Sequence, residues 1–223
     1  MPSFAVLFDL DGTLIDSEGL WFRAECDVVG RLGGTWGPED QAHCLGGPLE
    51  RVAAYMAQIT GSARDPDDIG RDLLDCMEAL LRSEPLEWRP GAREILEECR
   101  AAGVPTALVS ASHRRLLDAV AEAIARDTGD PHHAAFDATV AGDEVGNSKP
   151  HPEPYHAAAS MLGVPIEACV VLEDSPTGVA AGQASGAFVV AIPHMVAVPE
   201  APRRRVIETL DGVRLADLRA WAR

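Results

Sequence analysis

Residues 4–16 read Phe4-Ala-Val-Leu-Phe-Asp9-Leu-Asp11-Gly12-Thr13-Leu-Ile-Asp16, so a short apolar run ends in acidic residues. The run has the length and composition of a β-strand that is buried on both faces. Side chains alternate across a strand, so Asp9 and Asp11 point to the same side, about 7 Å apart. Gly12 lets the chain turn away from the sheet. Because open α/β sheets bind ligands at the carboxyl ends of their strands, we expect a functional site here.

The composition restricts the classes of partner. The chain has 223 residues, 47% hydrophobic and 24% charged, enough for one core and a modest insert. Its formal net charge of −16 argues against nucleic acid and anionic membranes, because phosphate contacts need clustered Lys and Arg. Any negatively charged ligand would therefore need local positive charge or a metal ion at its site.

Cysteine usage and the N-terminal residues bear on location. The cysteines are scattered, odd in number and without a C-x-x-C pair: Cys26, Cys44, Cys76, Cys99 and Cys169. This pattern fits reduced thiols in a cytosolic protein. The N-terminal residues lack a basic region and their apolar run meets Asp9 after a few residues, so we expect neither a signal peptide nor a transmembrane helix. We expect a cytoplasmic protein, and no pattern specifies an oligomeric state.

After Asp16 the pattern changes from strand to helix. Helices are predicted over residues 17–33, 49–60 and 66–83, with Ser17 as the capping residue of the first. No strand-like run interrupts residues 17–84. We expect this segment to form a small all-helical cap, a lid that excludes water and selects substrates.

From Gly91 onward, helices and apolar strands alternate. Helices are predicted over residues 91–102, 112–126, 152–162 and 177–185, and strands over 104–109, 136–141, 168–172 and 187–192. The tail from Arg205 adds a short strand and a last helix. This alternation predicts an α/β fold with a doubly wound parallel Rossmann-like sheet. Residues 1–16 and 85–223 would form this core, and residues 17–84 the cap.

Three further polar features follow predicted strands. Ser110 stands before a helix that Ser112 is expected to cap, so its hydroxyl and the neighbouring amides offer an anion cradle. Lys149 is the only lysine in the chain, which suggests a need for a compact ammonium. Glu173 and Asp174 directly follow the strand 168–172. Adjacent acids are unfavourable there unless they bind a metal or pair with a cation.

In order and context, these features resemble the motifs of the haloacid dehalogenase superfamily, whose members are mostly Mg-dependent phosphotransferases. The helical insert resembles the small cap of the phosphoglucomutase-like branch. Finer similarity to bacterial hexose and hexitol phosphate phosphatases lies in Ile15–Glu18, Leu20-Trp21, Arg23–Glu25, Leu45-Gly46 and Val171–Ser175.

The resemblance implies a phosphomonoesterase that acts on a sugar or polyol phosphate. Asp9 would attack phosphorus and Asp11 would serve as general acid and base. Mg²⁺ would be bound by Asp9, Asp174 and the backbone carbonyl of Asp11, while Glu173 would support a metal-bound water or pair with Lys149.

The phosphoryl group would be held by a second set of residues. These are Ser110 with the amide of Ala111, Lys149, and the backbone amides after Asp9, including Gly12. Arg114, early in the following helix, is a candidate substrate contact. The pair His132-His133 lacks metal-ligand spacing.

Four alternative functions differ from this one in the residues that they need. A dehalogenase needs no acid at position 11, and a phosphonate hydrolase needs a cap lysine, which is absent from the sequence. A non-catalytic binding module would be expected to lack at least one of the catalytic side chains. The sequence has them all: Asp9, Asp11, Ser110, Lys149 and Asp174. A phosphosugar mutase of the beta-phosphoglucomutase type stays open. Related mutases have a histidine and an arginine where this chain has Trp21 and Leu49, which counts against a mutase. Arg51, one helical step after Leu49, could supply the missing arginine.

Overall fold

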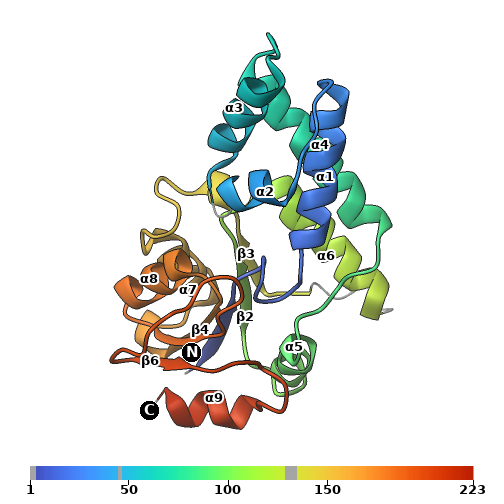
Figure 1. Ribbon diagram of the computed structural model, residues 1–223. Coiled ribbons are helices and arrows are strands. Elements are labelled where there is room, and N and C mark those ends of the chain that lie inside the picture. The colour runs from blue at the N-terminus through green and yellow to red at the C-terminus, as the bar shows by residue number, and fades with distance from the viewer. Residues whose placement is uncertain (1–3, 45–46, 129–134, 223) are drawn as a thin grey trace. The chain divides into compact units, whose positions relative to one another are not determined.

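The computed structural model describes residues 4–44, 47–128 and 135–222 (Figure 1). Leu45-Gly46 and His132-His133, noted in the sequence, lie outside these ranges. The chain divides into two compact units, residues 1–16 with 86–223 and residues 17–85. In the part of the chain that the structure describes, no helix is both long and apolar enough to cross a membrane.

The larger unit is built on a parallel sheet with strand order β3-β2-β1-β4-β5-β6. The strands are β1 (Ala5–Phe8), β2 (Thr106–Val109), β3 (Ala138–Val140), β4 (Cys169–Glu173), β5 (Phe188–Ala191) and β6 (Arg204–Val206). The predicted doubly wound sheet is therefore confirmed. Its strand order reverses between β1 and β4, and sheets of this type bind ligands at such a switch point.

Helices cover both faces of this sheet (Figure 1). They are α5 (Ala92–Ala101), α6 (Arg114–Thr128), α7 (Glu153–Leu162), α8 (Pro176–Ser185) and α9 (Leu215–Trp221), with 3-10 turns η1 (Gly142–Glu144) and η2 (Ile166–Ala168). Helices α7 and α8 bury their apolar residues against one face, where Leu7 and Val171 belong to the same core. Helix α5 lies against the other face, beside α9.

The smaller unit contains only helices among its described residues, as predicted. They are α1 (Glu18–Arg31), α2 (Pro38–Cys44), α3 (Leu49–Thr60) and α4 (Pro66–Ser83), and α4 packs against both α1 and α3. Helix α2 was not predicted, because its seven residues are too few for a helical hydrophobic period to show. It begins at Pro38, and Asp40 accepts a hydrogen bond from the Gly37 amide at 2.9 Å.

The expected capping role of Ser17 is wrong. Ser17 precedes α1, but its side chain makes no capping hydrogen bond. A capping side chain needs an extended backbone at its own residue, whereas Ser17 has φ −98° and ψ −4°. Asp65 has the extended backbone and caps α4, accepting from the Asp67 amide at 3.0 Å.

Candidate active site

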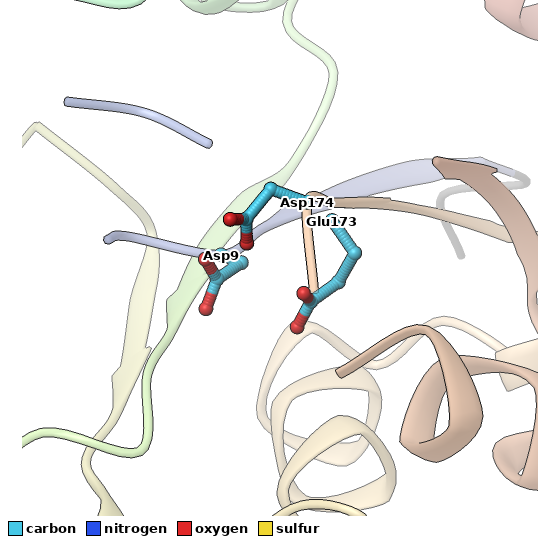
Figure 2. A group of neighbouring side chains, drawn as sticks. All are labelled: Asp9, Glu173 and Asp174. Carbon is cyan, nitrogen blue, oxygen red and sulfur yellow. The ribbon is translucent and has the colours of Figure 1, made fainter. Parts of the chain in front are cut away.

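Three buried carboxylates meet at the switch point of the sheet. Asp9 follows β1, Glu173 ends β4, and Asp174 comes next (Figure 2). The Asp9 amide donates to the Leu172 carbonyl at 3.0 Å, which aligns the ends of the two strands. One carboxylate oxygen from each acid lies within 4.8 Å of the others. Three of the residues predicted to bind a metal thus come together, although 164 positions separate Asp9 from Glu173 in the chain.

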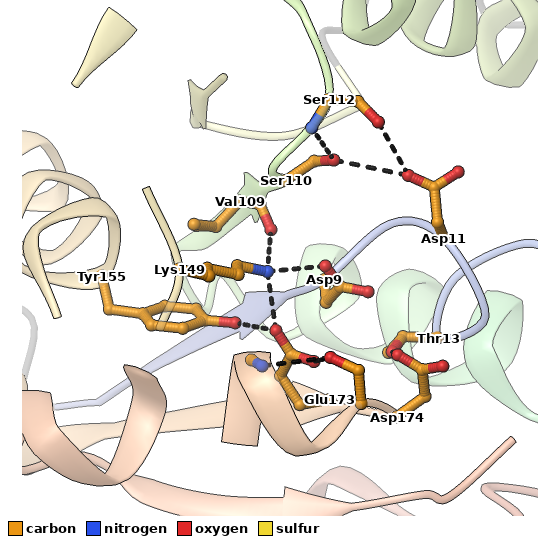
Figure 3. A network of polar contacts seen from close by, with 12 residues as sticks. Asp9, Asp11, Thr13, Val109, Ser110, Ser112, Lys149, Tyr155, Glu173 and Asp174 are labelled. Carbon is orange, nitrogen blue, oxygen red and sulfur yellow. Dashed lines mark hydrogen bonds and ion pairs between the residues drawn. The ribbon is translucent and has the colours of Figure 1, made fainter. Parts of the chain in front are cut away.

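Lys149 is the cation among these acids. Its Nζ donates to Asp9 Oδ1 at 2.6 Å, to Glu173 Oε1 at 2.6 Å and to the Val109 carbonyl at 2.8 Å (Figure 3). These three bonds use all three ammonium protons. The lysine side chain is 4% exposed, so it is held in one place.

The charges in this cluster do not balance. Burial and then the Glu173 charge raise the pKa of Asp9 well above its ordinary value, against the opposing effect of Lys149. Burial and Glu173 also raise the pKa of Asp174 to about 7. Burial by itself lowers the pKa of Lys149, but the carboxylates of Asp9 and Glu173 outweigh it and raise that pKa. The cluster therefore favours any added positive charge, and its all-oxygen donor set suits a hard divalent cation.

Asp11 lies beside Ser110 and Ser112, away from Lys149 and Glu173 (Figure 3). Ser112 Oγ donates to Asp11 Oδ2 at 3.0 Å, and Ser110 Oγ reaches the same oxygen at 3.5 Å. Ser110 Oγ in turn accepts from the Ser112 amide at 2.9 Å. The predicted cap role of Ser112 is wrong, because α6 begins at Arg114 and the Ser112 hydroxyl is directed to Asp11 instead.

The loop after Asp9 closes on Asp174 and depends on Gly12. Gly12 has φ +84°, and a Cβ there would overlap the Asp174 carboxylate and lie 3.3 Å from His194 Nδ1. Thr13 Oγ1 donates to Asp174 Oδ1 at 3.4 Å. A residue with a side chain at position 12 would therefore push Asp174 out of place.

Two predicted substrate contacts lie outside this network of side chains. Arg114 donates to Glu144 Oε1 at 2.9 Å and to Thr139 Oγ1 at 2.8 Å, bonds that tie α6 to η1 and β3. Ala111 is exposed, and its carbonyl packs where a Cβ on Gly142 would lie. Their roles in binding substrate stay predictions.

Sequence reasoning missed two residues that touch the site. Ser112 was predicted to cap a helix, and Tyr155 was given no role beyond its place in the predicted helix 152–162. Tyr155 is fully buried, and its hydroxyl donates to Glu173 Oε1 at 2.6 Å. In the sequence, only the spacing Ser110-x-Ser112 marked a second hydroxyl at the strand end.

The chain is similar to proteins of known family. A family model described as haloacid dehalogenase-like hydrolase matches residues 5–186. Hexitol phosphatase B from Escherichia coli (strain K12) is 34% identical over 192 residues, which cover 85% of this chain and 83% of that protein. The chloroplastic Protein SUPPRESSOR OF QUENCHING 1 from Arabidopsis thaliana is 34% identical over 190 residues, 84% of this chain but only 18% of that longer protein.

The fold also matches a solved structure. The crystal structure of CbbY from Rhodobacter sphaeroides in complex with phosphate superposes with a TM-score of 0.83 at 28% sequence identity. The match covers 98% of this chain and 99% of that one. The likeness therefore extends over both the sheet unit and the helical unit.

Proposed function

Because this chain belongs to the haloacid dehalogenase-like hydrolases, we propose that it is a Mg²⁺-dependent phosphatase that acts on a sugar or polyol phosphate. The membership confirms the resemblance recognised in the sequence. The observation that carries the proposal is the Asp9 carboxylate, bonded to Lys149 and flanked by Asp174, with Asp11 on the same loop. The similarity to hexitol phosphatase B supports the substrate class. Residues 17–84 are proposed as the cap that selects the substrate.

Asp9 and Asp11 share the chemistry. A carboxylate oxygen of Asp9 attacks phosphorus, the bond to the leaving oxygen breaks, and an aspartyl phosphate forms. Asp11 donates its proton to the leaving alkoxide. It then takes a proton from the water that attacks the aspartyl phosphate, which releases phosphate and restores Asp9. Ser112 holds the Asp11 carboxylate at the face where these proton transfers occur.

The remaining residues neutralise and position the phosphoryl group. Lys149 keeps Asp9 in place and offsets negative charge, and Ser110 with the neighbouring amides accommodates phosphoryl oxygens. Asp9, Asp174 and the Asp11 carbonyl would hold Mg²⁺, with Glu173 behind them. When bound, the ion supplies charge neutralisation for the phosphoryl oxygens. The excess of buried carboxylates over cations supports this assignment.

Metal removal tests the proposal directly. Treatment with EDTA should reduce hydrolysis of an aryl phosphate to background, and Mg²⁺ should restore it. Mg²⁺ alone should also stabilise the fold, by about 2.7 kcal/mol at a concentration 100-fold above its Kd. Thermal unfolding measures this stabilisation without any activity. The variant Asp174→Asn should lose it, and full hydrolysis in metal-free protein would refute the metal dependence.

Leaving-group dependence tests the role of Asp11. Asp11→Asn should slow transfer from an alkyl phosphate by roughly 10²- to 10⁴-fold, because the poor leaving group needs a proton. A nitrophenyl phosphate needs little protonation, so its burst of released phenol should slow far less. Ser112→Ala should show the same trend more weakly, and the exposed Ser83→Ala serves as control. Equal slowing of both substrates would contradict the assignment.

Arg51 in the helical unit is compatible with the alternative function, a phosphosugar mutase. Among the described residues of the helical unit, Arg51 is an arginine without a carboxylate partner, and its guanidinium donates to the Cys44 carbonyl at 3.3 Å. The other arginines there pair with acids: Arg23, Arg31, Arg64, Arg71 and Arg82. A mutase must hold a second phosphate. Isomerised product from a hexose 1-phosphate with its bisphosphate would favour that reaction over hydrolysis.

A further inference from the structure

Tyr155 connects helix α7 to the candidate active site. It is fully buried, its hydroxyl donates to Glu173 Oε1 at 2.6 Å, and its ring lies 5.1 Å from Lys149 Nζ (Figure 3). A buried hydroxyl is expected to have some partner. The identity of this partner matters, because Glu173 is also the residue that holds Lys149.

The Glu173 carboxylate is surrounded by donors from the protein. Its Oε1 accepts from both Tyr155 and Lys149 at 2.6 Å, and its Oε2 accepts from Ser175 Oγ at 3.3 Å. The residue is 0% exposed. A Cβ at position 178 would overlap this carboxylate, so glycine there leaves the room that it occupies. Its position is therefore set by hydrogen bonds to both oxygens and by the space beside Gly178.

We propose that Tyr155 is a positioning residue, which fixes the Glu173 carboxylate and through it the Lys149 ammonium on Asp9. The kinetic part of this inference rests on the proposed phosphatase function. The ammonium has no spare proton, since Asp9, Glu173 and the Val109 carbonyl take all three. A shift of the Glu173 carboxylate must therefore move the ammonium or break one of its bonds. Either change alters the charge that faces the Asp9 nucleophile.

Removing one oxygen atom tests the inference. Tyr155→Phe keeps the ring beside Lys149 and deletes only the hydroxyl. We expect kcat to fall about tenfold, as for the loss of one hydrogen bond to a charged group, with KM changed less than twofold. The matched control is Tyr55→Phe. Tyr55 is the chain's other tyrosine, and its hydroxyl also donates to a carboxylate, Asp40 Oδ1 at 2.8 Å, within the helical unit.

The solitary lysine supplies a second measurement that needs no activity. Protein free of tags and labelled with ¹³Cε-lysine gives one lysine signal, because Lys149 is the only lysine. Tyr155→Phe should shift this signal and Tyr55→Phe should not. An unchanged lysine signal overturns the inference whatever happens to kcat, and so does a change confined to KM.

If Tyr155→Phe does not fold, 3-fluorotyrosine in the Tyr55→Phe background strengthens the same hydroxyl as a donor without removing it. The lysine signal must then shift, and an unchanged signal again overturns the inference. If the wild-type protein hydrolyses no phosphate ester, the proposed function fails. The lysine signal still decides whether Tyr155 positions Lys149.

Discussion

Asp9→Asn should abolish turnover, lowering it by roughly 10⁴-fold or more, while the protein still folds. An amide oxygen cannot form the aspartyl phosphate that the carboxylate forms. The substitution keeps the side-chain shape, and the amide oxygen can still accept from Lys149 Nζ, which lies 2.6 Å from Asp9 Oδ1. Folding should also be spared because the change removes one of three buried negative charges that repel each other.

The measurement is hydrolysis of an aryl phosphate with Mg²⁺, with circular dichroism and thermal unfolding as checks on the fold. Asp127→Asn is the matched control. Asp127 accepts from Trp88 Nε1 at 3.0 Å and from Arg93 Nη1 at 2.8 Å, away from the cluster, so activity should persist. Near-normal turnover by Asp9→Asn would end the assignment of Asp9 as nucleophile.

Lys149→Arg should lower turnover by roughly 10³-fold although the charge is kept. The lysine directs three bonds of 2.6 to 2.8 Å from a single nitrogen, inside a space that leaves its side chain 4% exposed. A guanidinium is longer and planar, and its five N–H groups point outward as a fork. It cannot bond Asp9, Glu173 and the Val109 carbonyl together without displacing one of them.

The reverse exchange at the surface is the control. Arg93 pairs with Glu97 at 2.9 Å and with Asp127 at 2.8 Å, and it is 38% exposed, so Arg93→Lys should leave both turnover and folding nearly unchanged. Steady-state kinetics on both variants, with unfolding curves beside them, measure the difference. Turnover within tenfold of wild type in Lys149→Arg would show that charge, and not the compact shape of the ammonium, is what the site requires.

Much of the fold could be predicted from the sequence, because the patterns that indicate strands and helices are local. Apolar runs of four to six residues followed by polar residues marked the strands, and helical spacing marked most helices. Helix α2 was missed because it is too short for the helical hydrophobic period to repeat. The site followed from the same logic, since the carboxyl ends of parallel strands share one edge of the sheet. Asp9 and Asp174 were predicted in this way, whereas Lys149 was singled out as the only lysine in the chain.

Tertiary structure alone decided which hydrogen-bond partner each side chain takes. Ser112 is 101 residues from Asp11 in the chain, yet its hydroxyl donates to that carboxylate instead of capping the helix that follows it. Tyr155, 18 residues before Glu173, lay unremarked in the predicted helix 152–162, but its hydroxyl donates to that acid. A sequence pattern reports residue type and period. A hydrogen bond forms only when donor and acceptor come within about 3 Å, and the packing of distant segments sets that distance.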